Sequence, residues 1–241
     1  MNIALPPPRE RWRTAWTPGL TLLMVALALL ATDALAHGVS DKDKAFIQSM
    51  SGVHVLPYMY LGAKHMVTGY DHLLFLVGVI FFLYRLRDVV RYVTLFAVGH
   101  SVTLLAGVLL NIHANPYVID AIIGLSVVYK AFDNLGGFQR LFGFQPNPKA
   151  AVLVFGLFHG FGLATKIQEL SFSRDGLLGN LVSFNVGVEI GQFIALSMIL
   201  IVMTFWRQTR FFGQTAVAAN GALMCAGFIL IGYQLSGLAA G

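Results

Sequence analysis

Six long apolar blocks constrain the fold of this 241-residue chain more than any other feature. They cover residues 68–84, 92–111, 116–132, 150–166, 177–205 and 214–235. An α-helix rises about 1.5 Å per residue and the hydrocarbon core of a bilayer is about 30 Å thick, so each block can cross or nearly cross a membrane. The blocks therefore predict an all-α fold, a polytopic membrane helical bundle with about six transmembrane helices.

The composition excludes other classes of protein. Apolar residues make up 57% of the chain, charged residues only 11%, and the mean hydropathy is +0.73, which is wrong for a soluble domain. The net charge of +5 comes without a Lys/Arg stripe interleaved with aromatic residues, so we expect no nucleic acid partner. The single cysteine, Cys225, lies inside the last apolar block. Any metal site would therefore use His, Asp, Glu, Met or Asn side chains.

The N-terminus predicts a secretory signal over residues 1–36. Arg9, Arg11 and Arg13 precede a short apolar core at 21–31, and an Ala-x-Ala cleavage site ends at Ala36. The alternative is an uncleaved first helix. Cleavage would make His37 the first residue, and an α-amine beside an imidazole can chelate a transition metal. The competing interpretation is that His37 is merely tolerated by the peptidase.

The remaining chain divides into three predicted parts. Residues 37–67 form an external N-terminal segment with an interfacial helix near 45–50, residues 68–235 form the six-helix transmembrane domain, and residues 236–241 form a short external tail. Lys and Arg residues concentrate in every second loop between the apolar blocks. Loops of this kind usually lie on the cytoplasmic side of the membrane, so the charges predict which loops are cytoplasmic. These loops carry Arg85, Arg87, Arg91, Lys130, Arg140, Lys149, Arg207 and Arg210, whereas Lys166 belongs to a charge-balanced external loop. We therefore expect both mature termini on the outer side of the membrane.

Three apolar blocks contain a polar or ionisable residue at a similar predicted depth. The helix rise places His100 about 13 Å and His159 about 15 Å from the inner face, and Glu189 about 16 Å from the outer face. Asn185, Glu189 and Gln192 follow i, i+4, i+7 spacing and share one helix face. Such residues are expensive in hydrocarbon and by default predict a functional site, although a single histidine can also be a packing residue.

The segment HMVTGYDH carries the strongest ligand chemistry, in His65, Asp71 and His72. Imidazole and carboxylate suit first-row divalent ions, and a neighbouring carboxylate can set the tautomer of a histidine. In a continuous helix His65 and His72 would lie about 10 Å apart along the axis, too far to share one ion. Either Gly69 breaks the helix and brings them together, or the two histidines serve successive stations.

Four segments together resemble the HupE/UreJ family of bacterial membrane proteins: YLGAKHMVTGYDHLLFL, AVGHSVTLL, FGLFHGFGLA and FNVGVEIGQ. The resemblance extends from about Gly62 to Gln192, in a branch with a GYDHLLFL-type motif. It implies a small permease tied to nickel supply for hydrogenase and urease, with a cleaved signal and about six spans. The matching entrance positions are His65, Asp71 and His72, and the matching interior positions are His100, His159 and Glu189.

The motifs depart from the better-known branch at ligand positions. That branch opens with HPG-x-DH, where this chain reads TGYDH, and its second motif has two histidines in the style FHA-x-x-HG. Here the second motif contains His159 alone. The resemblance therefore implies the fold more directly than the substrate.

The leading hypothesis is a permease for a divalent transition metal ion, nickel or cobalt, rather than an enzyme. The ion would meet His37 and His65 outside, Asp71 and His72 at the mouth, and His100, His159, Asn185 and Glu189 near the midplane. No P-loop is present, so transport would use the ion gradient, the membrane potential or a partner. Possible partners besides the lipid bilayer are metalloenzyme maturation proteins.

Two alternatives stay open. An intramembrane zinc-dependent hydrolase would gather His72, His100 and His159 around one Zn²⁺, with Asp71 or Glu189 as the base. An accessory membrane subunit of a metalloenzyme assembly system would only bind metal or stabilise its partner. Ligands converging within about 3 Å of one point would favour catalysis, and ligands strung along a path would favour transport.

Overall fold

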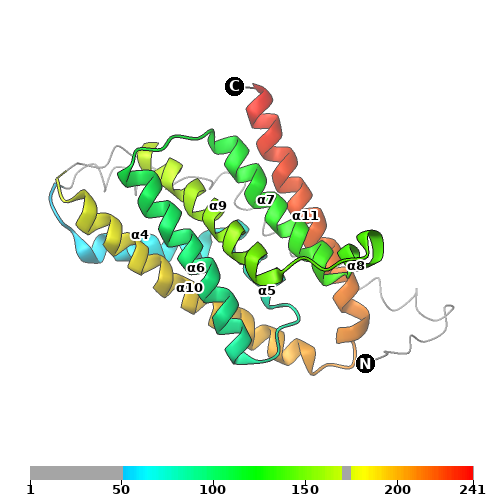
Figure 1. The fold of residues 1–241 in the computed structure, drawn as a ribbon. Coiled ribbons are helices and arrows are strands. Elements are labelled where there is room, and N and C mark those ends of the chain that lie inside the picture. The colour runs from blue at the N-terminus through cyan, green and yellow to red at the C-terminus, as the bar shows by residue number, and fades with distance from the viewer. Residues whose placement is uncertain (1–50, 170–174, 241) are drawn as a thin grey trace.

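A computed structural model describes residues 51–169 and 175–240, so the predicted signal peptide, His37 and the interfacial helix near 45–50 lie outside the described residues. The described part is all-helical, as predicted, and has no strand (Figure 1). Its eight helices are α4 (Val55–Thr68), α5 (Tyr70–Ile80), α6 (Leu86–Leu109), α7 (Pro116–Asn134), α8 (Gly137–Phe142), α9 (Pro148–Glu169), α10 (Leu177–Arg207) and α11 (Phe212–Ala240).

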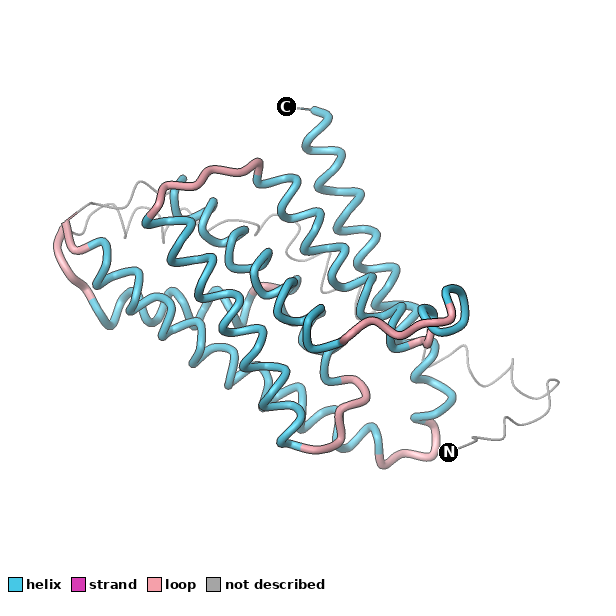
Figure 2. Tube along the Cα trace, viewed as in Figure 1, coloured by secondary structure: helices cyan, strands magenta, loops and turns pink. Residues whose placement is uncertain are grey.

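Helix pairs that are distant in sequence build the bundle. The most extensive pairs are α6 with α9, α4 with α10, and α7 with α11, and α7 also packs on α9 (Figure 1). The helices are joined by loops, coloured pink in Figure 2, and the short α5 packs mainly against α7. This order brings α4, α5, α6 and α9 around one interior region, where the candidate site lies.

Small residues allow two of these helix pairs to approach closely. A Cβ atom on Gly187 of α10 would lie 2.0 Å from the Met59 carbonyl oxygen of α4. A Cβ atom on Gly160 of α9 would lie 2.0 Å from the His100 carbonyl oxygen of α6. Backbones can only pack at this distance where one partner has no side chain, as is common in membrane helices. The second contact also fixes His100 against the helix that carries His159.

Four described helices are long and apolar enough to cross a membrane: Leu86–Leu109, Pro148–Gln168, Leu177–Arg207 and Phe212–Ala240. The predicted third span corresponds to α7, whose nineteen residues include Asp120, Lys130 and Asp133. The total of six spans stays a prediction. Residues 55–67, which the sequence assigned to the external segment, form α4 and pack along the α10 span.

The predicted first span, 68–84, is not one helix. The chain leaves helical geometry at Gly69, where φ is −71° and ψ is 96°, and α5 begins at the next residue. Gly69 donates its N–H to the His65 carbonyl at 2.8 Å and accepts from Leu73 N–H at 3.0 Å, so the break satisfies backbone groups of both helices. The predicted span therefore becomes the end of α4 and the eleven-residue α5.

Arg207 caps the C-terminal end of α5. Its guanidinium donates to the carbonyl oxygens of Ile80, Phe81 and Leu83, the last two at 2.9 and 3.0 Å, and stacks over the Tyr84 ring at 4.8 Å. Carbonyls at the C-terminal end of a helix lack intrahelical partners, and a cation there is favourable. Arg207 thus links the end of α10 to the short helix that starts at the candidate site.

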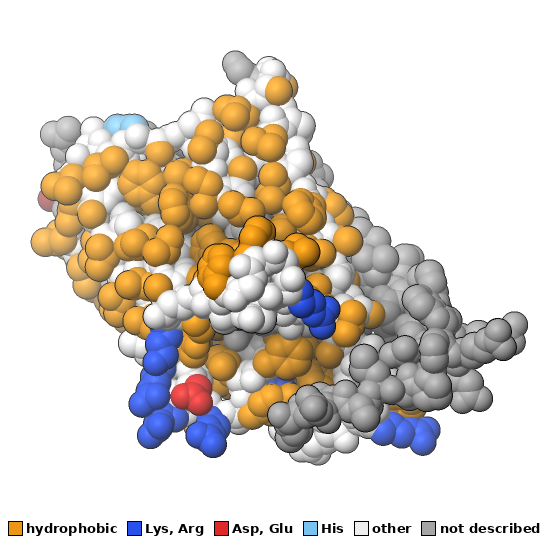
Figure 3. Space-filling model, turned by 45° about the vertical axis from the view of Figure 1, so that its right-hand side comes forward, with side chains coloured by type: hydrophobic (Ala, Val, Ile, Leu, Met, Phe, Trp, Pro, Cys, Tyr) orange, Lys and Arg blue, Asp and Glu red, His pale blue; other side chains and the backbone are white. Residues whose placement is uncertain are grey.

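The surface is suited to lipid. On the face shown in Figure 3, hydrophobic side chains dominate and Lys and Arg side chains lie mainly toward the lower edge. Exposed apolar residues on the long helices include Val98, Val102, Phe193 and Ile201. Arg207 contacts the loop before α6, so the cationic ends of α6 and α10 lie together, as the charge pattern of the loops requires. The compartment that this end faces stays a prediction.

Candidate functional site

Three histidines surround His72, and the four residues come from four different helices. Its ring centroid lies 5.2 Å from that of His65, 5.6 Å from that of His100 and 4.8 Å from that of His159. These residues belong to α4, α5, α6 and α9. His72, His100 and His159 are at most 2% exposed. Of the two geometries left open for His65 and His72, the structure therefore shows the broken helix that brings the rings together. We call these four residues the histidine cluster.

The cluster contains polar atoms without partners. Five imidazole nitrogens are buried and make no hydrogen bond in the described part of the chain: Nε2 of His65, His72, His100 and His159, and Nδ1 of His100. Buried polar atoms in native proteins are almost always satisfied, and each exception calls for an explanation. Five exceptions on adjacent rings indicate a place built to receive a ligand with hydrogen-bonding or coordinating capacity.

Two rings are oriented by hydrogen bonds through their other nitrogen. Asp71 Oδ1 accepts from Nδ1 of His72 at 2.9 Å and from the His72 backbone N–H at 2.8 Å. Nδ1 of His159 donates to the Phe155 carbonyl oxygen at 2.8 Å. When Nδ1 carries the proton, Nε2 presents a lone pair, which is how a carboxylate or carbonyl prepares a histidine for metal binding. The unpartnered Nε2 atoms of His72 and His159 fit this role.

The cluster is not an assembled chelate. Among residues 51–169 and 175–240, no three His, Cys, Asp or Glu side chains converge in a geometry that could hold one ion. The rings meet edge to face instead, with interplanar angles of 77°, 69° and 71° between His72 and its three neighbours. Because metal–nitrogen bonds are about 2 Å long, shared coordination would require the rings to turn.

Two phenylalanines close one side of the cluster. Phe96 packs against His72, His100 and His159 at centroid distances of 6.2, 6.0 and 5.1 Å, and Phe75 packs against His159 at 5.1 Å. Both phenylalanines are at most 1% exposed. An apolar wall excludes water and strengthens any interaction of the imidazoles with an ion. Sequence reasoning missed these residues, although Phe75 follows His72 by three positions and therefore shares its helix face.

Glu189 lies in a different environment. Its carboxylate accepts from the Ser101 hydroxyl at 3.3 Å and lines a groove of about 370 Å³ between α6 and α10. Gln192 lines the same groove, whereas none of the four histidines does. His100 and Ser101 are consecutive, so α6 directs one side chain into the cluster and the next into the groove. Asn185 Oδ1 is buried without a partner. The three residues predicted at one depth thus divide between two places.

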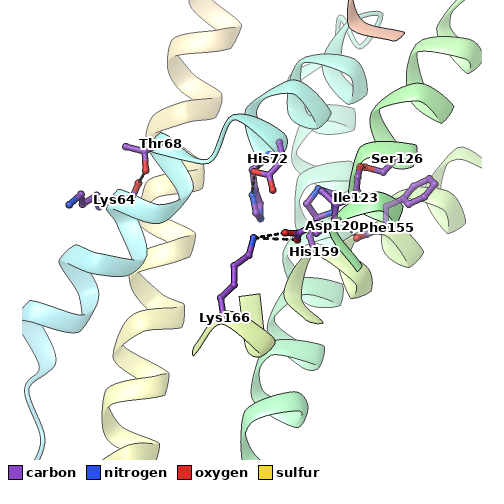
Figure 4. A network of polar contacts seen from close by, with 10 residues as sticks. Lys64, Thr68, His72, Asp120, Ile123, Ser126, Phe155, His159 and Lys166 are labelled. Atoms are coloured by element: carbon purple, nitrogen blue, oxygen red, sulfur yellow. Dashed lines mark hydrogen bonds and ion pairs between the residues drawn. The ribbon is translucent and has the colours of Figure 1, made fainter. Parts of the chain in front are cut away.

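An ion pair lies close to the histidine cluster. Lys166 of α9 contacts both carboxylate oxygens of Asp120 of α7, at 3.2 and 3.0 Å (Figure 4). Only 19% of the lysine side chain and 11% of the aspartate side chain are exposed. Lys166 lies two helical turns after His159 on the same face of α9. The sequence predicts Lys166 only as a loop charge, because charge patterning does not indicate which helices pack together, whereas the structure places it in the last turn of α9.

Comparison with known proteins agrees with the resemblance. A family model described as HupE / UreJ protein matches residues 41–240. The chain belongs to the HupE/UreJ family. No curated protein and no solved structure gives a significant match. Together with the four long apolar helices, membership identifies a membrane protein and suggests an accessory function related to nickel or cobalt.

In this HupE/UreJ protein the residues that carry the family resemblance do not form one unit. The matching entrance positions His65, Asp71 and His72 and the interior positions His100 and His159 meet in one cluster. The remaining interior position, Glu189, lies in the groove beside Ser101. The arrangement can therefore offer unpartnered imidazole nitrogens to a cation at one place and a carboxylate at another.

Proposed function

We propose that this HupE/UreJ protein is a permease that passes a divalent transition metal ion, nickel or cobalt, through the histidine cluster. One observation carries the proposal: five buried imidazole nitrogens without partners lie on the His72 ring and the three rings next to it. Imidazole is a suitable ligand for nickel, cobalt and zinc, and the residues present fit a divalent cation as substrate. The Asp71 carboxylate next to His72 supplies negative charge at the same place.

The broken helix supports transport. Ion sites in secondary transporters commonly lie where a membrane helix is interrupted, because unwound backbone and helix ends can contact the ion there. Here the break at Gly69 lies in the sequence between His65 and the Asp71–His72 pair. The rings of His65 and His159 each contact His72, and they do not point at one shared position. Adjacent but unassembled ligands can exchange an ion between them. A catalytic zinc would require three ligands fixed around one position.

The remaining predicted ligands take places around this cluster in the proposal. His37 would bind the ion outside, His65 would receive it, and Asn185 with Glu189 would be further ligands beyond the histidines. The loop charges support a bacterial inner membrane location with periplasmic termini. The ion would then be delivered to metalloenzyme maturation proteins in the cytoplasm, driven by its gradient or the membrane potential.

Metal uptake in cells tests the proposal. Cells producing the wild type, His72→Ala or the control His113→Ala at matched protein levels are supplied with trace ⁶³Ni²⁺ or ⁵⁷Co²⁺. His113 is an exposed loop histidine, so its removal should leave uptake unchanged. His72→Ala should reduce uptake to the level of cells without the protein, and uptake equal to wild type would contradict the permease. Near-stoichiometric zinc in the purified wild type would favour the hydrolase instead.

A further inference from the structure

The Asp120–Lys166 ion pair joins two helices beside the histidine cluster. The ammonium contacts both oxygens of the carboxylate, and both side chains are largely buried. Lys166 follows His159 by seven residues on α9, so the two side chains lie on one helix face, two turns apart. Figure 4 shows Lys166 extending away from its own helix toward Asp120. The pair thus fixes a positive charge at a defined place near the cluster.

The charge of Lys166 has the same sign as the proposed substrate. Asp120 holds its ammonium on the side of α9 that carries His159, a member of the cluster. Two cations repel one another, and the repulsion is poorly screened between buried groups. Asp120 has the opposite effect, because it both holds the ammonium on α7 and cancels part of its charge.

We propose that Lys166 and Asp120 set the affinity of the histidine cluster for a divalent cation. Lys166 weakens binding by repulsion, which favours release of the ion, and Asp120 limits this effect by holding the ammonium. The assignment rests on the proposed function, in which the cluster binds the ion. To the proposed function the assignment adds two positioning residues, which make no contact with the ion and determine how readily the cluster binds and releases it.

Opposite effects of the two neutral variants distinguish this role from a structural one. Lys166→Met removes the repulsion and leaves Asp120 as an additional negative group, so cobalt should bind about tenfold more tightly. Asp120→Asn removes one negative charge next to the ammonium, so cobalt should bind about tenfold more weakly. A pair that only stabilises the fold would give losses in both variants. The double variant should return close to the wild-type Kd.

The experiment is a titration of the purified full-length protein in detergent with CoCl₂, followed by calorimetry and by the visible absorption of bound cobalt. Lys166→Arg and Asp120→Glu keep both charges and should keep the wild-type Kd within about twofold. Lys166→Gln serves as a second neutral variant if Lys166→Met does not fold, as judged by size-exclusion chromatography. His72→Ala is the reference variant that shows how much cobalt still binds when the histidine cluster is disrupted.

The outcomes separate the two proposals. A tighter Kd in Lys166→Met or Lys166→Gln together with a weaker Kd in Asp120→Asn supports the assignment. Cobalt binding with an unchanged Kd in these variants, or a loss in all of them, overturns the affinity-setting pair and leaves the permease standing. No cobalt binding by the wild type, or binding that His72→Ala retains, overturns the cluster as the metal site and the inference with it.

Discussion

The ring of His72 lies 4.8 Å from the ring of His159, although one residue lies in the first turn of the short α5 and the other lies inside α9. Each ring is held through Nδ1, by Asp71 and by the Phe155 carbonyl, and each leaves Nε2 buried without a partner. Both histidines are thus oriented through Nδ1 with Nε2 unpartnered, and their rings are in contact. Two such imidazoles are the minimum needed to bind one cation between them. His65 and His100 extend this unit on either side.

Removal of the Asp71 carboxylate should weaken metal binding. Asp71→Asn keeps the size of the side chain and loses the charge that orients His72 through Nδ1. Partners of this kind are worth about 10- to 100-fold in metal affinity, so we expect a Kd for Co²⁺ weaker by that factor. A titration of purified protein measures it. The matched control Asp88→Asn removes a partly exposed carboxylate at the start of α6, which pairs with Arg91, and should bind cobalt as the wild type does.

Gly69 should tolerate no side chain. A Cβ atom there would lie 2.9 Å from the His65 carbonyl oxygen and 3.2 Å from both Asp71 Oδ1 and His72 Nδ1. Gly69→Ala should therefore displace the Asp71–His72 pair, destabilise the protein by about 1–3 kcal/mol and lower metal uptake. Gly221→Ala in α11 adds a methyl group to open space and is the control. Equal uptake and equal melting temperatures for the two variants would argue against a constrained break.

Arg207 should be important for stability rather than for binding. Arg207→Ala removes the donors to Ile80, Phe81 and Leu83 and leaves the end of α5 uncapped. Hydrogen bonds from charged groups contribute roughly 1.5–3 kcal/mol, so we expect a clear loss of thermal stability in detergent. Arg210→Ala removes an exposed arginine nearby and should have little effect. Thermal unfolding followed by size-exclusion chromatography compares the two.

The sequence predicted the helices and the mid-helix positions of the polar residues better than the directions of their side chains. Apolar block length and helix rise place His100, His159 and Glu189 near mid-helix, because both depend only on the backbone repeat. The position of a residue along a helix does not determine the direction in which its side chain points around the helix axis. The sequence therefore could not indicate that Glu189 faces a different place from the two histidines. The break at Gly69 was one of two allowed geometries, since a single glycine permits a break without requiring it. The pairing of Lys166 with Asp120 depends on the packing of α7 against α9, which no local pattern encodes.

Separation of Glu189 from the histidine cluster gives the last prediction. Glu189→Gln keeps a side-chain oxygen that can accept from Ser101 and removes the charge, so the groove between α6 and α10 should keep its shape. If Glu189 is a further ligand on the path, the variant lowers uptake of ⁵⁷Co²⁺ in cells. Because no histidine of the cluster lines the groove, the Kd of the purified variant for Co²⁺ should stay within about twofold of wild type. Loss of cobalt binding in Glu189→Gln would instead place its carboxylate among the ligands of the cluster, and unchanged uptake would remove it from the path.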